Sequence, residues 1–229
     1  MNLIALIMAG GSGERFGAGM PKQLVMLRGK PVLAWSAALF ARSPRVAGIL
    51  VVGPAADEEK VRAALPTEVV VKMRGFVPGG ATRQESVFAG LEALPKGTTH
   101  VLIHDAARPC TSEELRDRVI KALGEHNAVI PTIPATDTLM HVRAGSVESV
   151  VDRGSIARVQ TPQGFLRDLI IKAHQSARTR GFSSSDDGSL VLAMGEPVAT
   201  VEGERSNIKV TYRDDIAVAE AILKRGVSA

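Results

Sequence analysis

The 229-residue sequence has little cysteine and few aromatic side chains. Its single cysteine, Cys110, excludes an internal disulfide and a cysteine-based zinc site, and it is typical of a protein of the reducing cytoplasm. Aromatic residues make up 3% of the chain, too few for the platforms that stack single-stranded nucleic acid. No apolar run approaches the length of a membrane span, and the first residues lead into a strand pattern without a signal peptide. We therefore expect a cytoplasmic protein with neither a nucleic-acid nor a membrane partner.

The excess of one charge sign over the other is also small, because the formal net charge is +4 at pH 7, and the sequence has no basic tract. A small basic excess suits a small anionic substrate at least as well as a polymer. The sequence lacks a Ser-His-Asp arrangement, a nucleophilic-cysteine context and a histidine pair with metal-ligand spacing. What remains for chemistry is a set of cations, backbone donors and a carboxylate, which is typical of phosphoryl or nucleotidyl transfer.

Short apolar segments alternate with helical ones, and the length fits one domain over residues 1–229. Apolar strands separated by helices predict a Rossmann-like, mostly parallel sheet with helices on both faces and ligands at the carboxyl ends of the strands. The predicted strands are Leu3–Met8, Gly48–Val52, Val69–Lys72, Val101–His104 and Ala128–Pro131. The predicted helices are Val32–Ala41, Asp57–Leu65, Thr82–Leu94 and Ser112–Glu125, the last with Thr111 as its cap.

The pattern changes after Pro134. Thr138–Val142 and Val147–Asp152 alternate apolar and polar residues around a turn signal, which predicts an antiparallel hairpin arm at about 137–157. A two-stranded hairpin is marginal alone, so this one packs either on its own domain or on a second subunit, two alternatives that spacing leaves open. The remaining predicted elements are helices at Arg167–Arg180, Gly188–Met194 and Asp214–Lys224 and strands at Val198–Val201 and Ile208–Thr211.

A glycine-rich segment, Met8–Gln23, follows the first predicted strand. Such turns bring backbone N–H groups against phosphate oxygens. The spacing fits neither the dinucleotide fingerprint G-x-G-x-x-G nor the P-loop G-x-x-x-x-G-K-[ST]. The pattern that is present, G-x-G-x-R followed by P-K, resembles the opening of sugar-nucleotide and alcohol-phosphate nucleotidyltransferases.

Further polar residues follow other predicted strands. Asp105 and Arg108 come after the fourth strand, where a carboxylate can hold a substrate hydroxyl or a magnesium ion and an arginine can bind an anion. Gly79–Ser86 precedes a helix, with Thr82 as its predicted cap and glycines that let the backbone approach a base. Lys209 lies in an apolar segment, where it is either paired or directed outward.

Taken in order, these motifs resemble the 2-C-methyl-D-erythritol 4-phosphate cytidylyltransferase family. The resemblance runs from Leu3 to Ala221 and rests on A-G-G-S-G-E-R, P-K-Q, G-G-x-x-R-x-x-S-V, H-D-A-A-R-P, D-T, V-D-R, T-P-Q-G-F, S-D-D and N-I-K-V-T. It implies transfer of CMP from CTP to 2-C-methyl-D-erythritol 4-phosphate, with release of pyrophosphate and with Mg²⁺, in non-mevalonate isoprenoid biosynthesis.

The resemblance also implies roles for particular residues. Arg15 and Lys22 would neutralise charge on the α-phosphate, and the hairpin arm would reach into a second subunit of a homodimer. The residues implied to bind the nucleotide are Ala9, Gly10, Gly11, Ser12, Gly13, Gly80, Ala81 and Ser86. Those implied to bind the polyol phosphate are Asp105, Ala106, Arg108, Thr138, Arg153, Ser185 and Lys209, of which Arg153 and Lys209 would also be catalytic and Asp105 would stand near the metal.

The sequence departs from the family pattern at three places. Met8–Gly11 replaces the more usual P-A-A-G and is shared with ribitol-5-phosphate cytidylyltransferases, the first alternative. Ala81 stands where an acidic residue is common, and Ser185–Ser189 varies a second motif. A hexose-1-phosphate nucleotidyltransferase and a catalytically silent nucleotide-binding protein are the remaining alternatives.

Overall fold

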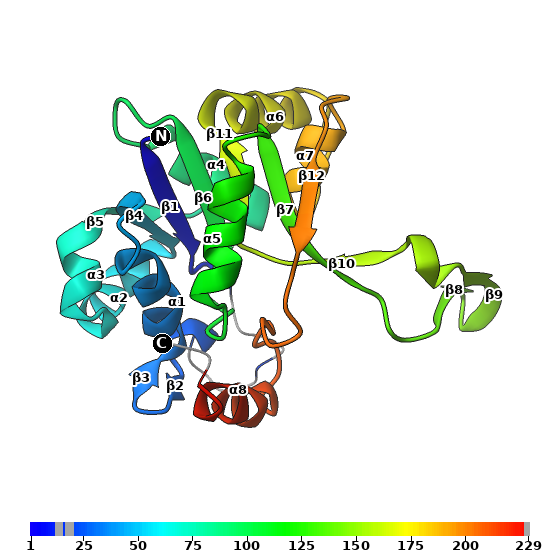
Figure 1. Ribbon diagram of the computed structural model, residues 1–229, viewed down its shortest axis with the longest axis horizontal. Helices are drawn as coiled ribbons and strands as arrows, with labels where there is room; N and C mark the ends of the chain where they lie inside the picture. Colours follow the sequence, from blue (N-terminus) through cyan, green and yellow to red (C-terminus); the bar gives the residue numbers. More distant parts are fainter. Residues whose placement is uncertain (12–15, 17–20, 227–229) are drawn as a thin grey trace.

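A mostly parallel β-sheet lies at the centre of the molecule (Figure 1). The computed structural model describes residues 1–11, 16 and 21–226. The strands of the central sheet are β1 (Leu3–Met8), β4 (Val46–Gly53), β5 (Met73–Pro78), β6 (His100–Asp105), β7 (Ala128–Pro134), β10 (Ala157–Val159), β11 (Gln163–Leu166) and β12 (Ala199–Glu202). Their order is β10-β7-β11-β6-β1-β4-β5, and β12 pairs with β7. The antiparallel strands are β10 and β11, so the predicted α/β fold is confirmed.

Strand β1 shows why this sheet is covered on both faces. All six of its residues are buried, and alternate residues contribute to two different hydrophobic clusters. One cluster includes residues of α1 (Val32–Ala41), α2 (Glu58–Ala64), α3 (Thr67–Lys72) and α5 (Glu113–Ala122). The other includes residues of α4 (Arg83–Glu92), α6 (Arg167–Thr179) and α7 (Asp187–Leu192). Figure 1 shows α1 and α5 in front of the sheet and α4 behind it.

The chain reverses its direction across the sheet beside β1. It runs from β1 outward through β4 to β5, and α4 then carries it back to β6 on the other side of β1. Ligands of open α/β sheets bind at the carboxyl ends of the strands where such a reversal occurs. The ends of β1 and β6 therefore mark the expected site.

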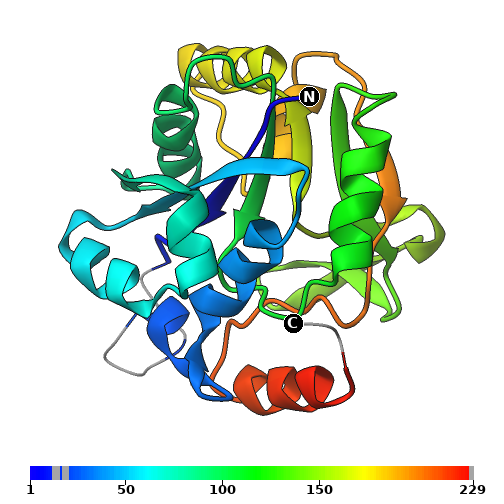
Figure 2. The ribbon, with the colours of Figure 1, turned by 60° about the vertical axis from the view of Figure 1, so that its left-hand side comes forward.

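A third cluster lies beyond one end of the sheet. Helix α8 (Asp215–Lys224) packs there with β2 (Met26–Leu27), which pairs with β3 (Lys30–Pro31). Figure 2 shows α8 lying across the bottom of the molecule. Cys110 belongs to this cluster, and burial raises the pKa of its thiol to about 12.

No helix in the described part of the chain is long and apolar enough to cross a membrane.

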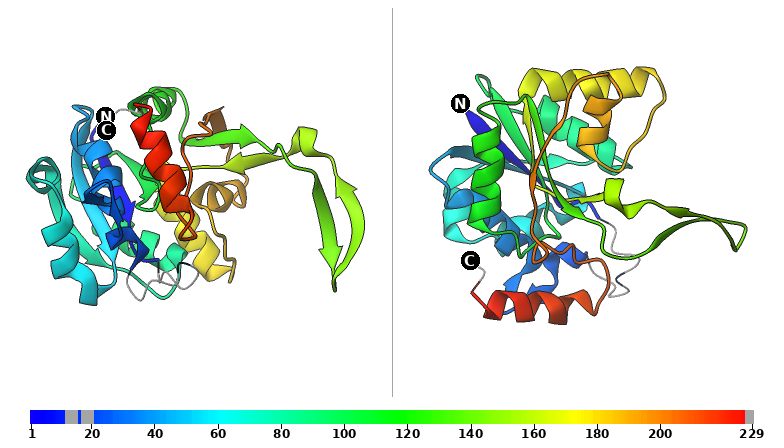
Figure 3. Two further views of the ribbon diagram at one scale, coloured as in Figure 1. Left: turned by 90° about the horizontal axis from the view of Figure 1, so that it is seen from below. Right: turned by 45° about the vertical axis from the view of Figure 1, so that its right-hand side comes forward.

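Strands β8 (Leu139–Arg143) and β9 (Ser146–Val151) form a separate two-stranded antiparallel sheet. Both views of Figure 3 show them extending away from the rest of the chain. Met140 pairs with Val150 and Val142 with Val147, and all four side chains are exposed. The hairpin thus carries cross-strand apolar pairs that its own chain leaves uncovered.

One predicted strand is wrong. Val69–Lys72 belongs to helix α3, and the strand of this region is β5, at Met73–Pro78. The run of three valines favoured a strand, but only Val69 is buried and Val71 is 74% exposed. In a short helix that begins after Pro66, one residue, Val69, can face the interior while its neighbours stay exposed. Packing therefore outweighed the β propensity of the valines.

Three further expectations need correction near the site. Ile208–Thr211 is not a strand in the structure, and Gln163–Leu166, where no strand was predicted, is strand β11 in the middle of the sheet. The Val210 N–H of this segment donates to the Ala107 carbonyl at 2.8 Å, and the Ile208 N–H donates locally to the Ser206 carbonyl. The cap of α5 is Ser112 and not Thr111, because the Ser112 hydroxyl accepts the Leu115 N–H at 3.0 Å.

Candidate functional site

The glycine-rich segment begins where β1 ends. The Ala9 N–H donates to the Val52 carbonyl at 2.6 Å, and the Ala9 carbonyl accepts from Nε2 of buried Gln23 at 2.6 Å. Both backbone groups of Ala9 are therefore hydrogen-bonded within the protein, and the next two residues, Gly10 and Gly11, line a pocket. Ser12, Gly13 and Arg15 lie outside the described residues.

This first pocket has a volume of about 240 Å³ and lies at the ends of β1 and β6. Lys22, which begins the short 3₁₀ helix Lys22–Leu24, passes over Gly11 so closely that a Cβ there would lie 3.2 Å from Lys22 Cε. A side chain at residue 11 would compete with the lysine for this space. The pocket is lined by Met8, Gly10, Gly11, Lys22, Gly80, Ala81, Thr82, Arg83, Ser86, Asp105, Ala107 and Lys209.

The loop before α4 forms one wall of this pocket. Thr82 caps α4, as predicted, and forms a reciprocal capping box with Glu85. The Ser86 hydroxyl accepts the Gly80 N–H at 3.1 Å and lies 2.8 Å from the Thr82 carbonyl, to which it donates. A Cβ on Gly79 would come within 2.8 Å of the Ser86 oxygen. The glycines thus allow Ser86 to fold the loop tightly, which exposes backbone groups at residues 80 and 81 to the pocket.

Asp105, the last residue of β6, is the centre of the charge arrangement. Its Oδ2 lies 2.6 Å from Nζ of Lys209, and its Oδ1 lies 3.2 Å from Nε of Arg83. Burial alone would raise the pKa of this carboxyl, but Arg83 and Lys209 outweigh burial and hold the pKa well below its usual range. Asp105 is therefore an anion held between two cations at neutral pH.

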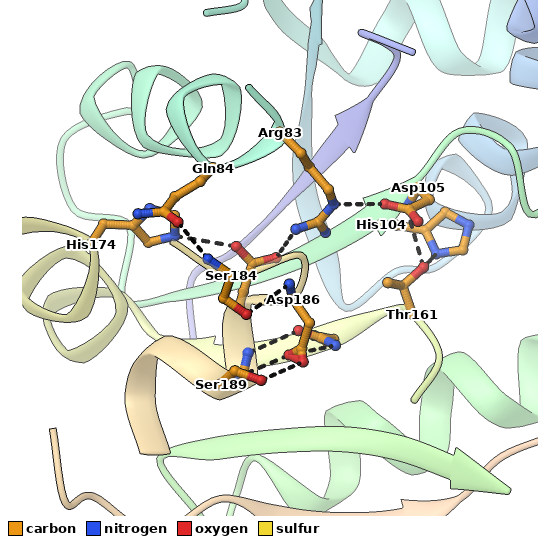
Figure 4. Close-up of polar contacts among 12 residues, drawn as sticks. Arg83, Gln84, His104, Asp105, Thr161, His174, Ser184, Asp186 and Ser189 are labelled. Carbon is orange, nitrogen blue, oxygen red and sulfur yellow. Dashed lines mark hydrogen bonds and ion pairs between the residues drawn. The ribbon is translucent and has the colours of Figure 1, made fainter. Parts of the chain in front are cut away.

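Arg83 extends this arrangement into the helices behind the sheet (Figure 4). Its Nη1 lies 2.8 Å from Oδ2 of Asp187, and Oδ1 of Asp187 lies 3.2 Å from Nε2 of buried His174. Burial acts to raise the pKa of Asp187, yet Arg83 and His174 hold it below its ordinary value. A chain of polar contacts therefore runs from α6 through α7 and α4 to the end of β6.

Sequence reasoning assigned no role to Arg83, Asp187 or His174. One signal could have found Arg83, which is the first residue of α4. A cation is unfavourable at a helix N-terminus because the helix dipole is positive there, so an arginine in this place needs another reason. No comparable local signal marks Asp187 and His174, because their partners lie far away in the sequence.

The segment that carries Lys209 is held by side chains instead of a strand ladder. Asn207 is fully buried, donates through Nδ2 to the Thr161 carbonyl at 2.9 Å and accepts from the Thr111 hydroxyl at 2.7 Å. Its own carbonyl accepts from Nη1 of Arg108 at 2.7 Å. The amide side chain thus replaces the missing strand partners and brings Lys209 to Asp105.

A second pocket, of about 230 Å³, lies beside the first. Asp105, Arg83 and Lys209 line both pockets and so form the wall between them. The other residues of the second pocket are polar or charged apart from Val159: Arg108, Gln160, Thr161, Gln163, Ser185 and the acidic Asp186. The two pockets together can hold two anionic groups on either side of one set of charges.

The structure does not bring every predicted site residue to these pockets. Ala106 is 1% exposed and belongs to the core, while its neighbour Ala107 lines the first pocket. Thr138 immediately precedes β8, and Arg153 lies after β9, where its Nη1 donates to the Thr136 carbonyl at 2.9 Å. Neither residue lines the two pockets of its own chain, and the hairpin strands beside them extend away from the rest of the chain (Figure 3).

Two buried groups stand directly behind Asp105. The Asp105 N–H donates to Oγ1 of Thr161 at 3.2 Å, and the same oxygen lies 3.0 Å from Nδ1 of His104. Burial lowers the pKa of His104 to about 3, so its ring is neutral at physiological pH. In the described part of the chain, no group of three or more histidine, cysteine and acidic side chains could hold a metal ion by itself.

Comparisons with known proteins show the family to which the chain belongs. The family model described as IspD, 2-C-methyl-D-erythritol 4-phosphate cytidylyltransferase, matches residues 3–225. A protein of that name from Synechococcus elongatus is 39% identical over 221 residues, which are 96% of this chain and 95% of the relative.

Two solved structures are also similar. The 4-diphosphocytidyl-2C-methyl-D-erythritol synthase of Anaerococcus prevotii is 32% identical with a TM-score of 0.83, over 98% of this chain and 99% of the other. The 2-C-methyl-D-erythritol 4-phosphate cytidylyltransferase of Thermus thermophilus is 36% identical with a TM-score of 0.79, over 96% and 98%.

The fold, the two adjoining pockets at the carboxyl ends of the parallel strands and the family match together identify the class of protein, an α/β nucleotidyltransferase. The match to the family model covers nearly the whole chain. The chain belongs to the 2-C-methyl-D-erythritol 4-phosphate cytidylyltransferase family.

Proposed function

We propose that this protein transfers CMP from CTP to 2-C-methyl-D-erythritol 4-phosphate and releases pyrophosphate. The observation that carries the proposal is the shared wall of Asp105, Arg83 and Lys209 between two pockets. Nucleotidyl transfer needs a donor phosphate and an acceptor phosphate in contact, and two pockets that meet at fixed charges provide such a meeting point. The family of the chain supports this choice of donor and acceptor.

The first pocket is assigned to CTP. Gly10 and Gly11, with Ser12 and Gly13 beyond the described part, would offer backbone N–H groups to the triphosphate. Gly80, Ala81 and Ser86 would contact the cytosine base through the loop before α4, and Ala9 supports the turn behind them. An acidic side chain at residue 81 is not required if backbone groups read the base.

The second pocket is assigned to the acceptor. Asp105 would accept hydrogen bonds from the polyol hydroxyls, Arg108 and Lys209 would hold the phosphate, and Ser185 would contact the acceptor from the start of α7. Ala106 would contribute only through the backbone fold at the end of β6. The acceptor thus meets both cationic and carboxylate side chains, which suits a phosphate and hydroxyl groups on one molecule.

The reaction needs charge neutralisation more than proton transfer. An oxygen of the acceptor phosphate attacks the α-phosphorus of CTP, the new P–O bond forms, and the bond to the bridging oxygen breaks so that pyrophosphate leaves. A phosphate monoester is already an anion, so no general base is required. Lys22, Lys209 and Arg15 would offset the charge that builds on the α-phosphate.

The residues present fit a magnesium ion that arrives with the nucleotide. Mg²⁺ prefers one or two carboxylates together with substrate phosphates and water, and among the described residues Asp105 provides a carboxylate to the first pocket. Because Arg83 and Lys209 already contact both carboxylate oxygens, most ligands would come from the phosphates. When bound, the ion would neutralise the triphosphate and orient its oxygens.

The hairpin is assigned to a homodimer. Its exposed apolar pairs need a cover, and its Thr138 and Arg153 carry groups that suit a phosphate but lie away from their own pockets. A symmetric pair of chains would place each hairpin against the other subunit, where Arg153 would complete the acceptor pocket.

We also propose a cytoplasmic location, because the single cysteine suits a reducing compartment.

Pyrophosphate release tests the function. We expect it with CTP and 2-C-methyl-D-erythritol 4-phosphate, and we expect much slower release with ribitol 5-phosphate, with hexose 1-phosphates or with UTP or dTTP. Preference for ribitol 5-phosphate would overturn the acceptor assignment, and preference for UTP or dTTP with a hexose 1-phosphate would overturn the donor assignment. CTP binding without turnover on any acceptor would identify a silent nucleotide-binding protein.

A further inference from the structure

The P-K-Q motif ends in Gln23, a residue that the two pockets do not explain. Its side chain is 2% exposed and lines neither pocket. A buried amide needs hydrogen-bond partners, because an unpaired polar group is costly away from water. Gln23 meets this need with a short bond, in which its Nε2 donates to the Ala9 carbonyl at 2.6 Å. This bond joins the two ends of the glycine-rich segment Met8–Gln23.

The Ala9 end of the segment is held independently of Gln23. Ala9 directly follows β1, and its N–H donates to the Val52 carbonyl of β4 at 2.6 Å. The residue is 1% exposed and belongs to one of the hydrophobic clusters on the sheet. Ala9 is therefore a fixed point, and the Gln23 amide attaches the other end of the segment to it.

The Gln23 end lies in a single turn of 3₁₀ helix, Lys22–Leu24. The Leu24 N–H donates to the Pro21 carbonyl at 2.9 Å, and the Val25 N–H donates to the Lys22 carbonyl at 3.3 Å. Hydrogen bonds in such a short 3₁₀ turn have poorer geometry than those of an α-helix, so the turn depends on contacts made by its side chains. Gln23 provides a contact of this kind, directed at Ala9.

Lys22 precedes Gln23 in the same turn, and its side chain passes over Gly11. A Cβ on Gly11 would lie 3.2 Å from Lys22 Cε and 3.9 Å from Lys22 Nζ. The stem of a lysine is long and flexible, so the place of its ammonium group depends on where its backbone is held. Because Gly11 follows Ala9 by two residues, the bond between Gln23 and Ala9 fixes Lys22 relative to the part of the turn that it covers.

We propose that Gln23 is a positioning residue for Lys22: its amide holds the 3₁₀ turn against Ala9, so that the Lys22 ammonium stands where charge builds on the α-phosphate. This inference rests on the proposed function, in which Lys22 acts on the transition state. Without the amide, Ala9 keeps its bond to Val52, so the glycine turn stays on the sheet while Lys22 loses its register with that turn. Gln23 itself needs to touch neither substrate.

Two variants of Gln23 test the proposal. Gln23→Met keeps the length of the side chain and removes the donor, whereas Gln23→Asn keeps an amide that is too short to reach Ala9. We expect either change to lower kcat about tenfold, the worth of one well-formed hydrogen bond, and to change the affinity for CTP by less than about threefold. Steady-state kinetics and equilibrium binding of CTP measure the two quantities. A wild-type kcat in either variant, or equal losses in turnover and affinity, would overturn the proposal.

Thr98→Val is the matched control for a general loss of stability. Thr98 is 6% exposed, and its Oγ1 donates to the Pro95 carbonyl at 2.7 Å, so this change also removes one buried donor from a backbone carbonyl. Thr98 lies before β6, at the opposite end of that strand from Asp105. Its replacement should leave kcat and CTP affinity within about twofold of the wild type, even if the unfolding free energy falls. A tenfold loss of kcat in Thr98→Val would overturn the proposal.

A double-mutant cycle shows whether Gln23 acts through Lys22. In a Lys22→Ala background the ammonium is already gone, so Gln23→Met should lower kcat by less than a further twofold or so. A full additional tenfold loss in that background would mean that Gln23 acts by another route, and it would overturn the positioning role.

Amide hydrogen exchange gives a readout that does not need activity. Exchange at the Leu24 and Val25 N–H groups should be faster in Gln23→Met, and exchange at the Ala9 N–H should stay as in the wild type. Unchanged rates at residues 24 and 25 would overturn the positioning role. Failure of the wild type to release pyrophosphate from CTP and 2-C-methyl-D-erythritol 4-phosphate would overturn the proposed function instead, so the two failures are distinguishable.

Discussion

Single residues in this site are defined by their partners more than by their type. Asp105 is buried, yet it is ionised because Arg83 and Lys209 contact its two oxygens. Lys209 would be costly in an apolar segment if it were unpaired, and the ion pair with Asp105 explains its presence. Lys22 differs from the many surface lysines and arginines because its side chain passes over the glycine turn.

The role of Lys22 can be read from its kinetics. If it offsets charge that exists only in the transition state, Lys22→Ala should lower kcat by about 100-fold or more and change the affinity for CTP much less. Steady-state kinetics together with equilibrium binding of CTP would measure both quantities. Equal losses in turnover and in affinity would contradict a transition-state role.

The lowered pKa of His104 predicts how the stability of the protein depends on pH. Burial lowers its pKa to about 3 in the folded protein from the ordinary value of 6.5, so the unfolded chain binds one more proton between these values. Stability should therefore fall as the pH falls below about 6.5, by about 2 kcal/mol from this group between pH 7 and pH 5. Urea unfolding at the two pH values would measure the loss.

His104→Asn serves as the control for this measurement, because it keeps a side-chain acceptor and removes the titration. The variant should show a pH slope that is smaller by about 2 kcal/mol over the same interval, whatever its stability at pH 7. Equal slopes in the wild type and the variant would mean that His104 is not held neutral.

At the scale of elements, the site is assembled from the ends of strands and the starts of helices. Strand β6 delivers Asp105, α4 begins with Arg83, and α7 begins with Asp187. Helix α6 supports Asp187 through His174, so four elements meet in one chain of contacts (Figure 4). Displacement of one of these helices would change the contacts of Asp105 at the end of β6, because short polar contacts connect the elements.

Removing the charge of Asp187 should expose this dependence. The carboxylate is 1% exposed, and Asp187→Asn would leave the Arg83 guanidinium with one anionic partner in place of two. We expect a loss of about 3 kcal/mol of unfolding free energy at pH 7, measured by urea denaturation. Because the pKa of Asp187 is depressed, this contribution is present above about pH 4 and disappears as the pH falls further.

Asp168→Asn is the matched control for Asp187→Asn. Asp168 also pairs with an arginine, Arg167, but its side chain is 74% exposed. Its replacement should change the unfolding free energy by less than about 1 kcal/mol. Similar losses in the two variants would show that the buried pair has no special weight.

At the scale of the whole molecule, the hairpin is the feature that one chain does not explain. It extends away from the rest of the chain (Figures 1 and 3). The side chains of Met140, Val142, Val147 and Val150 on it are exposed. Arg153 follows it on the same extension. A second copy of the chain would give these groups a surface to cover and a site to complete.

Subunit mixing tests the shared site. Lys22→Ala and Arg153→Ala chains should each be nearly inactive, but a mixed dimer would contain one intact site if Arg153 acts in the neighbouring subunit. After full exchange of equal amounts, about a quarter of the wild-type activity should return, since half of the dimers are mixed and each has one working site.

A mixture of Lys22→Ala and Lys209→Ala chains is the control for this experiment. Both lysines line the pocket of their own chain, so every site in every dimer stays defective and no activity should return. Recovery in the control, or no recovery in the Arg153→Ala mixture after demonstrated exchange, would contradict a site shared through the hairpin.

The sequence by itself determined the parts of this protein that depend on local patterns. Strand β1 and helix α1 were predicted with their observed bounds, because both are apolar runs with clear ends. The glycine-rich turn, the capping box at Thr82 and the motifs that resemble the family are also local, and they indicated nucleotidyl transfer. The fold class and the family followed from these features together.

Only the tertiary structure decided which residues meet. Arg83 contacts Asp187 across 104 positions, and Asn207 holds a segment that has the composition of a strand but does not form one. The valine run of α3 and the strand β11 were misread because burial on the sheet, and not local propensity, sets their conformation. Contacts between distant side chains leave no periodic trace in a sequence, since each depends on the packing of whole elements and not on spacing along the chain.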